Sequence, residues 1–293
     1  HGISIGADKI KKEDKNIMYG YVFQYGNENV KIGSGGTNLN TDSYSFAFYG
    51  TNLKENQFFS DGIIGLSFLD IDQKRVIFGN TLKGNRDGQQ LFGSINIGKR
   101  IHDQKLKLNP GIKLDLGYTK LRSFKEKTVL GNSLSDALFY NDQNIKSALA
   151  TIGVLFDIND KREEKIINQH GRFEYIEDLS SSSNTEFYYL NNQTTVYEYK
   201  ANKKSDHNYR IGYGLDITSI TGWSIVGNFE RFGASGKGYN NEIYLSLGYV
   251  PIDEMKFSLE FDESNNTIFE FANKINDFDL KINSNYNFFS EAP

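Results

Sequence analysis

Few residues in this sequence have the types and spacings that support catalysis or metal binding. Its four histidines, His1, His102, His170 and His207, are scattered and lack the HExxH spacing by which a helix presents two imidazoles to zinc. Ser180–Ser183 has no His or Asp partner at a nucleophile's spacing. The absence of cysteine removes thiol nucleophiles, thiolate ligands and disulfides. We therefore expect no catalytic residues, no metal site and no cofactor.

Three further features resemble functional sites only superficially. Gly233–Gly238 (GASGKG) lacks the earlier Gly and the following Ser/Thr of a phosphate-binding loop. Glu242 and Glu260 could act as acid and base inside a barrel, but no Ser–His pattern accompanies them. Trp223 is better explained as an anchor at a membrane interface than as a ligand platform. The sequence therefore favours a protein that is not an enzyme.

The element best suited to carry the polar residues is Leu106–Tyr118. Its even positions are apolar or aromatic, and its odd positions are polar, charged or Gly. Side chains of a strand alternate between faces, so this period of two predicts a strand with one apolar and one polar face. Its length exceeds the common strand of about 5–6 residues and suits a membrane strand of about 9–11.

The same alternation recurs along the chain, separated by turn-rich gaps. With Leu106–Tyr118, the predicted strands number fourteen: Gly2–Asp8, Asn16–Gly26, Ser43–Gly50, Phe58–Phe68, Leu91–Ile97, Ala148–Phe156, Ile167–Tyr175, Tyr209–Ile217, Trp223–Phe229, Ile243–Tyr249, Met255–Phe261, Thr267–Phe271 and Phe278–Phe288. Neighbouring segments are spaced for hairpins with no helical pattern between them, which predicts an antiparallel sheet.

Composition agrees with a strand-rich membrane protein. Gly 28, Tyr 18 and Phe 22 stand against only Pro 3, and no apolar run approaches the length of about 20 residues that a membrane helix needs. The net charge of −4, with both signs spread along the chain, gives no basic face for nucleic acid. We predict an all-β fold, a transmembrane antiparallel up-and-down β-barrel of about 12–14 strands.

The gaps between the predicted strands alternate between short and generally longer ones. Short turns at one end and long loops at the other are typical of outer-membrane barrels, whose short turns are periplasmic. The longer gaps are Gly33–Asp42, Asp70–Gly88, Thr119–Asn144, Glu177–Asp206 and Gly233–Asn240. Aromatic runs within Glu177–Asp206 indicate an external hairpin.

The polar face of the predicted strands carries charges of both signs. It holds Lys107, Lys113, Asp115, Arg210, Asp216, Glu230, Glu242, Lys256, Glu260, Asp279 and Lys281. Such side chains are costly against lipid and ordinary in a water-filled lumen. Their arrangement is equally compatible with a lumen laced by ion pairs and with a selective pore.

Several short motifs occur in a fixed order along the chain: Gly6-Ala7-Asp8 in the first strand, Tyr49-Gly50, Arg75, Gly98–Arg100 and Leu108-Asn109-Pro110. In this order they resemble the autotransporter β-domain family, the translocator of type V secretion in Gram-negative bacteria. The resemblance extends loosely to Tyr249. It implies an outer-membrane barrel that anchors and exports an N-terminal passenger. The implied partners are outer-membrane lipid, the barrel-assembly machinery and the passenger itself.

The sequence departs from this family at both ends. The family's pore-threading helix and first strand should precede His1, and its twelve-stranded barrel closes near Tyr249, whereas 251–293 extends beyond that point. We expect 1–293 to form a single barrel domain. Lys281–Phe288, with Lys281, Tyr286 and Phe288, resembles the C-terminal signal that the insertion machinery recognises, with Asn283 where Gly is usual.

That signal must lie on the periplasmic side, which conflicts with a count of three strands after Pro251. We resolve the conflict by supposing that Thr267–Phe271 is not an independent spanning strand. Two alternative functions stay open on the sequence. One is a stand-alone outer-membrane pore or adhesin barrel, and the other is a soluble β-protein that binds lipid or sugar.

Overall fold

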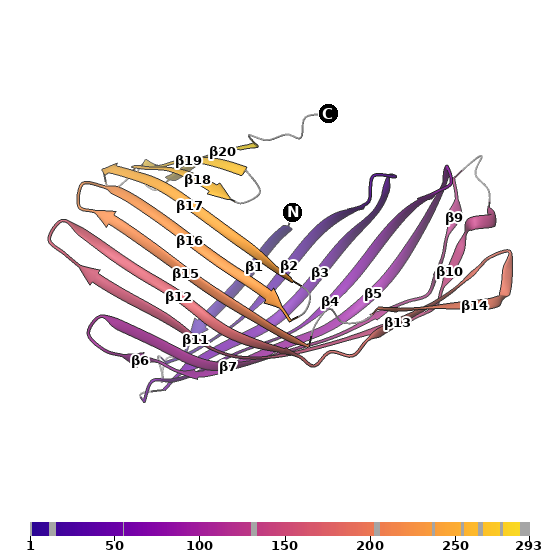
Figure 1. The fold of residues 1–293 in the computed structure, drawn as a ribbon, viewed down its shortest axis with the longest axis horizontal. Coiled ribbons are helices and arrows are strands. Elements are labelled where there is room, and N and C mark those ends of the chain that lie inside the picture. Colours follow the sequence, from indigo (N-terminus) through magenta and orange to yellow (C-terminus); the bar gives the residue numbers. More distant parts are fainter. Residues whose placement is uncertain are drawn as a thin grey trace. The chain divides into compact units, whose positions relative to one another are not determined.

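The chain is built almost entirely of antiparallel β-strands (Figure 1). The computed structural model describes residues 2–11, 16–54, 56–129, 134–201, 206–235, 238–252, 255–262, 266–275 and 278–287. Their one helical element is the 3₁₀ turn η1 (Leu134–Asp136). In this part of the chain, no helix has the length and apolarity to cross a membrane.

The main sheet follows the order of the sequence, each strand being hydrogen-bonded to the next on its path. The strands of this path are β1 (Gly2–Ile10), β2 (Ile17–Ile32), β3 (Thr37–Leu53), β4 (Phe58–Ile77), β5 (Asn80–Lys99), β7 (Leu106–Leu121), β11 (Gln143–Lys161), β12 (Lys165–Asp178), β15 (His207–Ser219), β16 (Trp223–Ala234), β17 (Gly238–Ile252), β18 (Met255–Asp262), β19 (Asn266–Ile275) and β20 (Phe278–Asn287). Off this path, β6 (Ile101–His102) pairs with β7, and β9 (Lys127–Thr128) pairs with β5. The predicted antiparallel strand order is confirmed.

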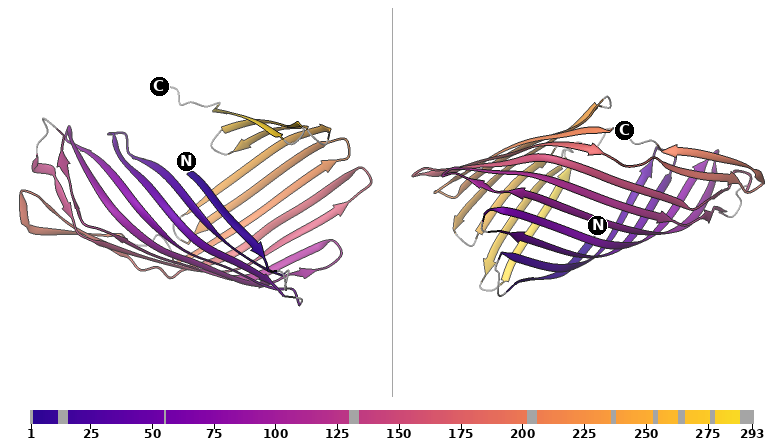
Figure 2. Two further views of the ribbon diagram at one scale, coloured as in Figure 1. Left: turned by 180° about the vertical axis from the view of Figure 1, so that it is seen from behind. Right: turned by 90° about the horizontal axis from the view of Figure 1, so that it is seen from below.

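The chain divides into two compact units, each described here by itself. Unit 1 contains 1–97, 112–150 and 178–204, and unit 2 contains 98–111, 151–177 and 205–293. Figure 2 shows the strands of each unit running side by side in the order of their colours.

Apolar side chains remain exposed in rows along one face of the strands. In unit 1, Phe48, Ile64 and Ile112 are among the most exposed of them. In unit 2, Ile225 and Ile243 are exposed in the same way. A sheet that leaves its large apolar residues outside, strand after strand, is typical of a face that contacts lipid.

The strands extend well beyond the segments that alternate clearly in sequence. Two of the predicted long loops are instead continuations of hairpins. β4 runs to Ile77 and β5 begins at Asn80, so only Phe78 and Gly79, both with positive φ, form the turn. Likewise β2 and β3 pair until Ile32 faces Thr37. The predicted asymmetry between the two ends therefore arises partly from strand length rather than loop length.

A second sheet of four strands lies in unit 1. It joins β8 (Phe124–Lys125), β10 (Leu138–Tyr140), β13 (Ser183–Tyr189) and β14 (Asn192–Ala201), in the order β14-β13-β10-β8. Its residues come from the two longest gaps of the sequence, those after β7 and β12. The predicted hairpin is confirmed as β13 and β14, which pair from Ser183↔Ala201 to Tyr189↔Asn192; its external position stays a prediction.

The supposition that Thr267–Phe271 is not an independent strand is wrong. This segment belongs to β19, which pairs with β18 from Thr267 to Asn273 and with β20 from Asn266 to Ile275. The apolar residues of this strand lie within five positions of the sequence, so the alternating pattern predicted a strand that is too short. Because each step from β12 to β20 is antiparallel, β20 ends at the same end of unit 2 as β12.

Candidate functional site

A row of polar and charged side chains crosses three neighbouring strands of unit 2. The antiparallel registers place His170 opposite Gly214, Arg172 opposite Gly212, and both glycines opposite polar residues of β16. Opposite residues of antiparallel strands share a face, so these side chains lie on the face opposite to the exposed Ile211 and Tyr213. The row lines a cavity of about 500 Å³.

Ion pairs link the charged members of this row. Arg210 Nε lies 3.1 Å from Glu230 Oε1, and Arg172 Nε lies 3.5 Å from Glu230 Oε2. Arg210 Nη1 also lies 3.5 Å from Glu174 Oε2. Two arginines and two glutamates thus form a continuous network across β12, β15 and β16. Ion pairs of this kind are what a lumen laced by ion pairs would contain, and the alternative of a selective pore stays open.

The other end of the row is held by His170. Its Nε2 lies 2.9 Å from Asn228 Oδ1, and its Nδ1 lies 3.6 Å from Asp216 Oδ2. A Cβ at Gly214 would overlap Asn228 Oδ1, so only glycine leaves room for this pairing. The strand therefore needs Gly214 for the imidazole to reach across it.

The row retains unused hydrogen-bonding capacity. Three buried side-chain atoms have no hydrogen-bond partner among the residues that the structure describes: Asn168 Oδ1, Asp216 Oδ1 and Arg210 Nε, the last of which lies within ion-pair distance of Glu230. Buried polar atoms are normally satisfied, so their occurrence together indicates a surface that can bind a polar segment or water. Among the described residues, no cluster of His, Asp or Glu could hold a metal ion.

The other predicted lumen residues are distributed along several strands. Lys113 and Asp115, both in β7, form an ion pair of 2.9 Å, and Lys107 lies near the start of the same strand. Glu242 of β17 is exposed and stands opposite Glu230. Lys256 and Glu260 lie in β18, and Asp279 and Lys281 in β20, where the structure describes the backbone pairing alone. Their facing the lumen stays a prediction.

A buried ion pair connects β4 to the four-stranded sheet. Arg75 Nε donates to Glu126 Oε1 at 2.8 Å, and its Nη2 donates to Glu126 Oε2 and to the Asp136 carbonyl at 2.6 Å. Glu126 is 1% exposed and also accepts the Leu138 N–H at 2.9 Å. The carboxylate raises the pKa of the Arg75 guanidinium. Asn80 of β5 donates to the Asp136 side chain at 2.8 Å, which adds a second link.

A second arginine holds the same sheet from β5. Arg86 Nε donates to the Arg122 carbonyl at 2.6 Å and Nη2 to the Asn141 carbonyl at 3.0 Å, while Nη1 donates to Gln143 Oε1 at 3.2 Å. Its guanidinium carbon lies 5.5 Å from the centre of the Phe124 ring, in cation–π range. Burial lowers the pKa of Arg86. The Arg75 and Arg86 contacts thus fix the sheet onto the extended strands of unit 1.

The residues that carry the family resemblance lie at positions with little room. Gly6 and Ala7 are in β1, where a Cβ on Gly6 would lie 2.7 Å from the Tyr21 carbonyl oxygen. Asp8 accepts a hydrogen bond from the Tyr49 hydroxyl at 3.4 Å, across Gly20, which stands opposite Asp8. Pro110 lies within β7.

Aromatic residues mark the short-turn end of unit 2. Trp223 begins β16 and stacks on Tyr249 with ring centres 4.5 Å apart. A Trp–Tyr pair at a strand end is typical of a membrane interface. Of the predicted C-terminal signal, Lys281 and Tyr286 lie in β20, and Phe288 lies outside the described residues.

Three members of the polar row were missed in the sequence. His170, Arg172 and Glu174 lie in the weakest predicted segment, where Gln169 and Gly171 interrupt the apolar positions. Alternation was nonetheless present, because Asn168 and the three residues occupy consecutive even positions. The polar face of a membrane strand can therefore be predicted from alternate polar residues even where the row of apolar residues is interrupted.

Long antiparallel strands with apolar outer rows and a polar opposite face define a transmembrane β-barrel of the bacterial outer membrane. The model of the family described as "Autotransporter beta-domain" matches residues 1–230, and the chain belongs to this family. A comparison with curated proteins finds no match.

Solved structures of outer-membrane proteins are similar to this chain. The translocator domain of autotransporter NalP from Neisseria meningitidis is 16% identical, with 85% of this chain and 78% of that chain covered and a TM-score of 0.51. BauA, the ferric preacinetobactin receptor from Acinetobacter baumannii, is 10% identical over 96% of this chain and 49% of that chain, with a TM-score of 0.49. The first of these likenesses supports the fold.

Proposed function

We propose that this chain anchors an N-terminal passenger in the outer membrane and exports it by type V secretion. During export, the passenger segment contacts the polar row of unit 2. The observation that carries this proposal is membership of the autotransporter β-domain family over 1–230. No step of this function requires catalysis, and we infer that the chain is not an enzyme.

The chemistry of the polar row supports contact with a moving polypeptide. Within the described part of the chain, Arg210 and Asp216 each keep a buried atom without a hydrogen-bond partner. The cavity beside them is lined by Arg172 and Glu230, which carry charges of opposite sign. A passing backbone offers N–H donors and carbonyl acceptors in alternation, so it can satisfy either kind of atom in turn. Because the polar row carries charges of both signs, a passenger segment of one charge meets repulsion as well as attraction and is not held strongly.

The inferred partners follow from the same proposal. Lipid surrounds the exposed apolar rows, the barrel-assembly machinery inserts the chain, and the passenger precedes His1 together with a threading helix and first strand. In this view 1–293 is one barrel domain, and 251–293 extends the barrel of the family beyond its usual end.

Surface display of an epitope N-terminal to His1 tests this function in intact cells. The full-length protein should present the epitope to antibody and to added protease, because export places the passenger outside. Barrel insertion is followed separately by heat-modifiable gel mobility. An inserted barrel whose epitope stays inaccessible would refute export.

A matched pair of double variants tests the polar row. Arg172→Gln with Arg210→Gln removes both cations of the network and should slow appearance of the epitope without preventing insertion. The control, Arg100→Gln with Arg162→Gln, removes the same charge near the short turns. Equal export kinetics in the two double variants would remove the polar row from the proposal and leave the export function itself standing.

A further inference from the structure

The outer, apolar face of unit 1 continues beyond its apolar rows as a polar surface. On β4, Ile64, Leu66 and Phe68 are exposed, and the next residues on the same face are Asp70, Asp72 and Lys74. The registers bring the corresponding residues of β3 alongside, with Asn38 opposite Lys74. A lipid that contacts the apolar rows therefore lies next to this polar surface, which continues along the same strands.

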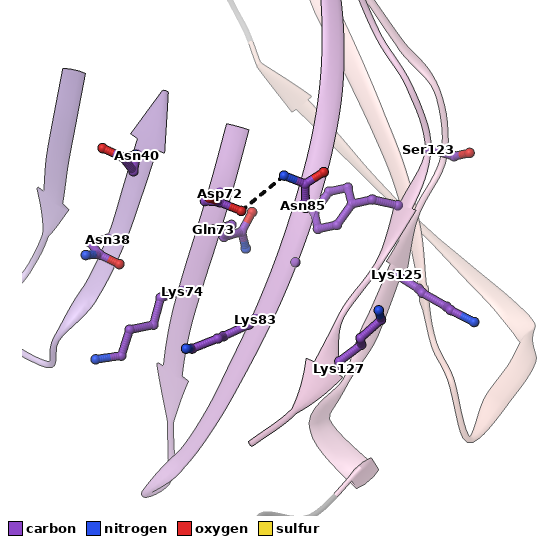
Figure 3. A pocket seen from close by; sticks show the side chains of 12 residues that line it. Asn38, Asn40, Asp72, Gln73, Lys74, Lys83, Asn85, Ser123, Lys125 and Lys127 are labelled. Carbon is purple, nitrogen blue, oxygen red and sulfur yellow. Dashed lines mark hydrogen bonds between the residues drawn. The ribbon is translucent and has the colours of Figure 1, made fainter. Parts of the chain in front are cut away.

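Three lysines gather on this surface from three neighbouring strands. Lys74, Lys83 and Lys127 come from β4, β5 and β9 and, together with Lys125 of β8, line a hollow of about 730 Å³ (Figure 3). Lys83 stands directly opposite Lys127 in the antiparallel pairing of β5 with β9. Like charges facing each other across a sheet are destabilising unless an anion lies between them. None of the three forms an ion pair among the residues that the structure describes.

The acidic residues of the same surface are already engaged by neutral partners. Asn85 Nδ2 lies 2.6 Å from Asp70 Oδ1 and 3.1 Å from Asp72 Oδ1 (Figure 3 shows the second contact). Asp42 accepts hydrogen bonds from Asn27 and from Tyr25, which lower the pKa of this carboxyl. Asp72 lines the same hollow as the lysines, but these carboxylates are engaged by neutral hydrogen-bond donors, and Lys74 lies farther from the apolar band than Asp70 and Asp72.

The height of the lysine row decides which anion can reach it. Lys74 lies six residues beyond Phe68, about 20 Å along the strand at roughly 3.3 Å per residue. With a tilt of about 40°, the row stands roughly 15 Å above the apolar border. The headgroup layer of an ordinary phospholipid extends only about 5–8 Å beyond the hydrocarbon core. A lipid must therefore carry a larger anionic headgroup to meet these lysines.

We propose that Lys74, Lys83 and Lys127 form a docking surface for the phosphorylated saccharide headgroup of an outer-leaflet glycolipid. The long connections after β7 and β12 place this end of the strands at the cell surface. The acyl chains of the glycolipid contact the apolar rows, and its phosphorylated sugars rise along the same face to the lysines. Charge complementarity is provided by phosphate groups between Lys83 and Lys127.

Binding of purified, detergent-folded protein to rough lipopolysaccharide with a phosphorylated core tests the proposal. Each surface cation contributes about a fivefold factor at low salt, so the triple Lys→Gln variant should bind about a hundredfold more weakly. The difference should shrink in high salt, because screening shortens the reach of these charges. Circular dichroism and heat-modifiable mobility establish that the variant is folded.

A control triple carries the same change of charge at the short-turn end. Lys9→Gln, Lys161→Gln and Lys165→Gln alter exposed lysines there and should leave the affinity within about twofold. Dephosphorylated lipopolysaccharide and phosphatidylglycerol vesicles should bind both triples equally. The proposal is overturned if the two triple variants lose affinity for lipopolysaccharide equally, or if neither loses any. It is also overturned if the Lys74, Lys83 and Lys127 triple loses affinity for phosphatidylglycerol, or if millimolar inorganic phosphate alone competes with lipopolysaccharide.

Discussion

Removal of the Glu126 carboxylate should release the four-stranded sheet while leaving the main sheet intact. Glu126 is the acceptor for two Arg75 donors and for the Leu138 N–H. Truncation to Ala leaves the Arg75 charge and a backbone donor without their partner at a site that is almost fully buried. Breaking a buried pair in this way costs about 3–5 kcal/mol. We expect about 4 kcal/mol for local opening of the sheet.

Hydrogen exchange resolved by segment measures this opening. At about 1.4 kcal/mol per factor of ten, the amides of β10 and β13 should exchange roughly a thousandfold faster in Glu126→Ala. Amides of β3 and β4 below the extension should be unchanged. The double variant Arg75→Met with Glu126→Leu replaces the pair by apolar side chains and should exchange more slowly than Glu126→Ala.

The exposed pair of Lys113 and Asp115 provides the control. Its side chains are 48% and 32% exposed, so Lys113→Gln should change stability by no more than about 1 kcal/mol. The reasoning is refuted if Glu126→Ala leaves the exchange of β10 and β13 unchanged. It is also refuted if exchange rises equally in every strand, because the pair would then support the whole molecule rather than the sheet.

Three other perturbations test other parts of the molecule. Ile112→Arg, on an apolar position that is 60% exposed, should cost about 2–4 kcal/mol in lipid, whereas Lys113→Ser should be nearly silent in equilibrium unfolding in bilayers. Gly214→Ala should displace the His170 ring, seen as a changed imidazole NMR shift, and an unmoved ring would contradict the packing. The Asp160 carboxyl has a lowered pKa because Lys105 and then Arg162 bind it. The ionised carboxylate therefore stabilises the folded protein above pH 3.8, and this contribution is lost as the pH falls further. Wild type and Asp160→Asn should converge in thermal unfolding at low pH.

The fold could be read from the sequence where the two faces of a strand meet different surroundings. Lipid on one side and water on the other impose alternation, so the hairpin order from β1 to β17 was visible. Beyond the membrane both faces meet water, and the pattern disappears. In β4, Asp72, Gln73, Lys74 and Arg75 are all polar although they continue the strand. The sequence pattern therefore predicts loops where the strands in fact continue.

The contacts of the candidate site were harder to predict than its residue types. Arg75 and Glu126 are 51 residues apart, and no local pattern links them. Arg210 and Asp216 were placed on the polar face because they interrupt a clear alternation. Their pairing, Arg210 with Glu174 and Glu230 and Asp216 with His170, follows only from the register between strands, which depends on turns rather than on side-chain type.

The position of the closing strand illustrates the same limit at the end of the chain. Counted along the main sheet, β17 is the eleventh strand, and it ends at the short-turn end beside the Trp223–Tyr249 stack. One preceding strand, as the family implies, would make an even count of twelve. β20 ends instead at the end of the long connections, the wrong side for a signal read from the periplasm.

Two substitutions distinguish these strands as the insertion signal. If β17 closes the barrel, Tyr249→Ser should reduce insertion into the outer membrane strongly, while Phe288→Ser and deletion of Ser290–Pro293 should be tolerated. If the predicted signal at Lys281–Phe288 operates, Phe288→Ser should abolish insertion. Insertion of each variant is measured by heat-modifiable gel mobility of the membrane fraction. Because β19 is a paired strand and β20 ends at the end of the long connections, we expect Tyr249→Ser to have the larger effect.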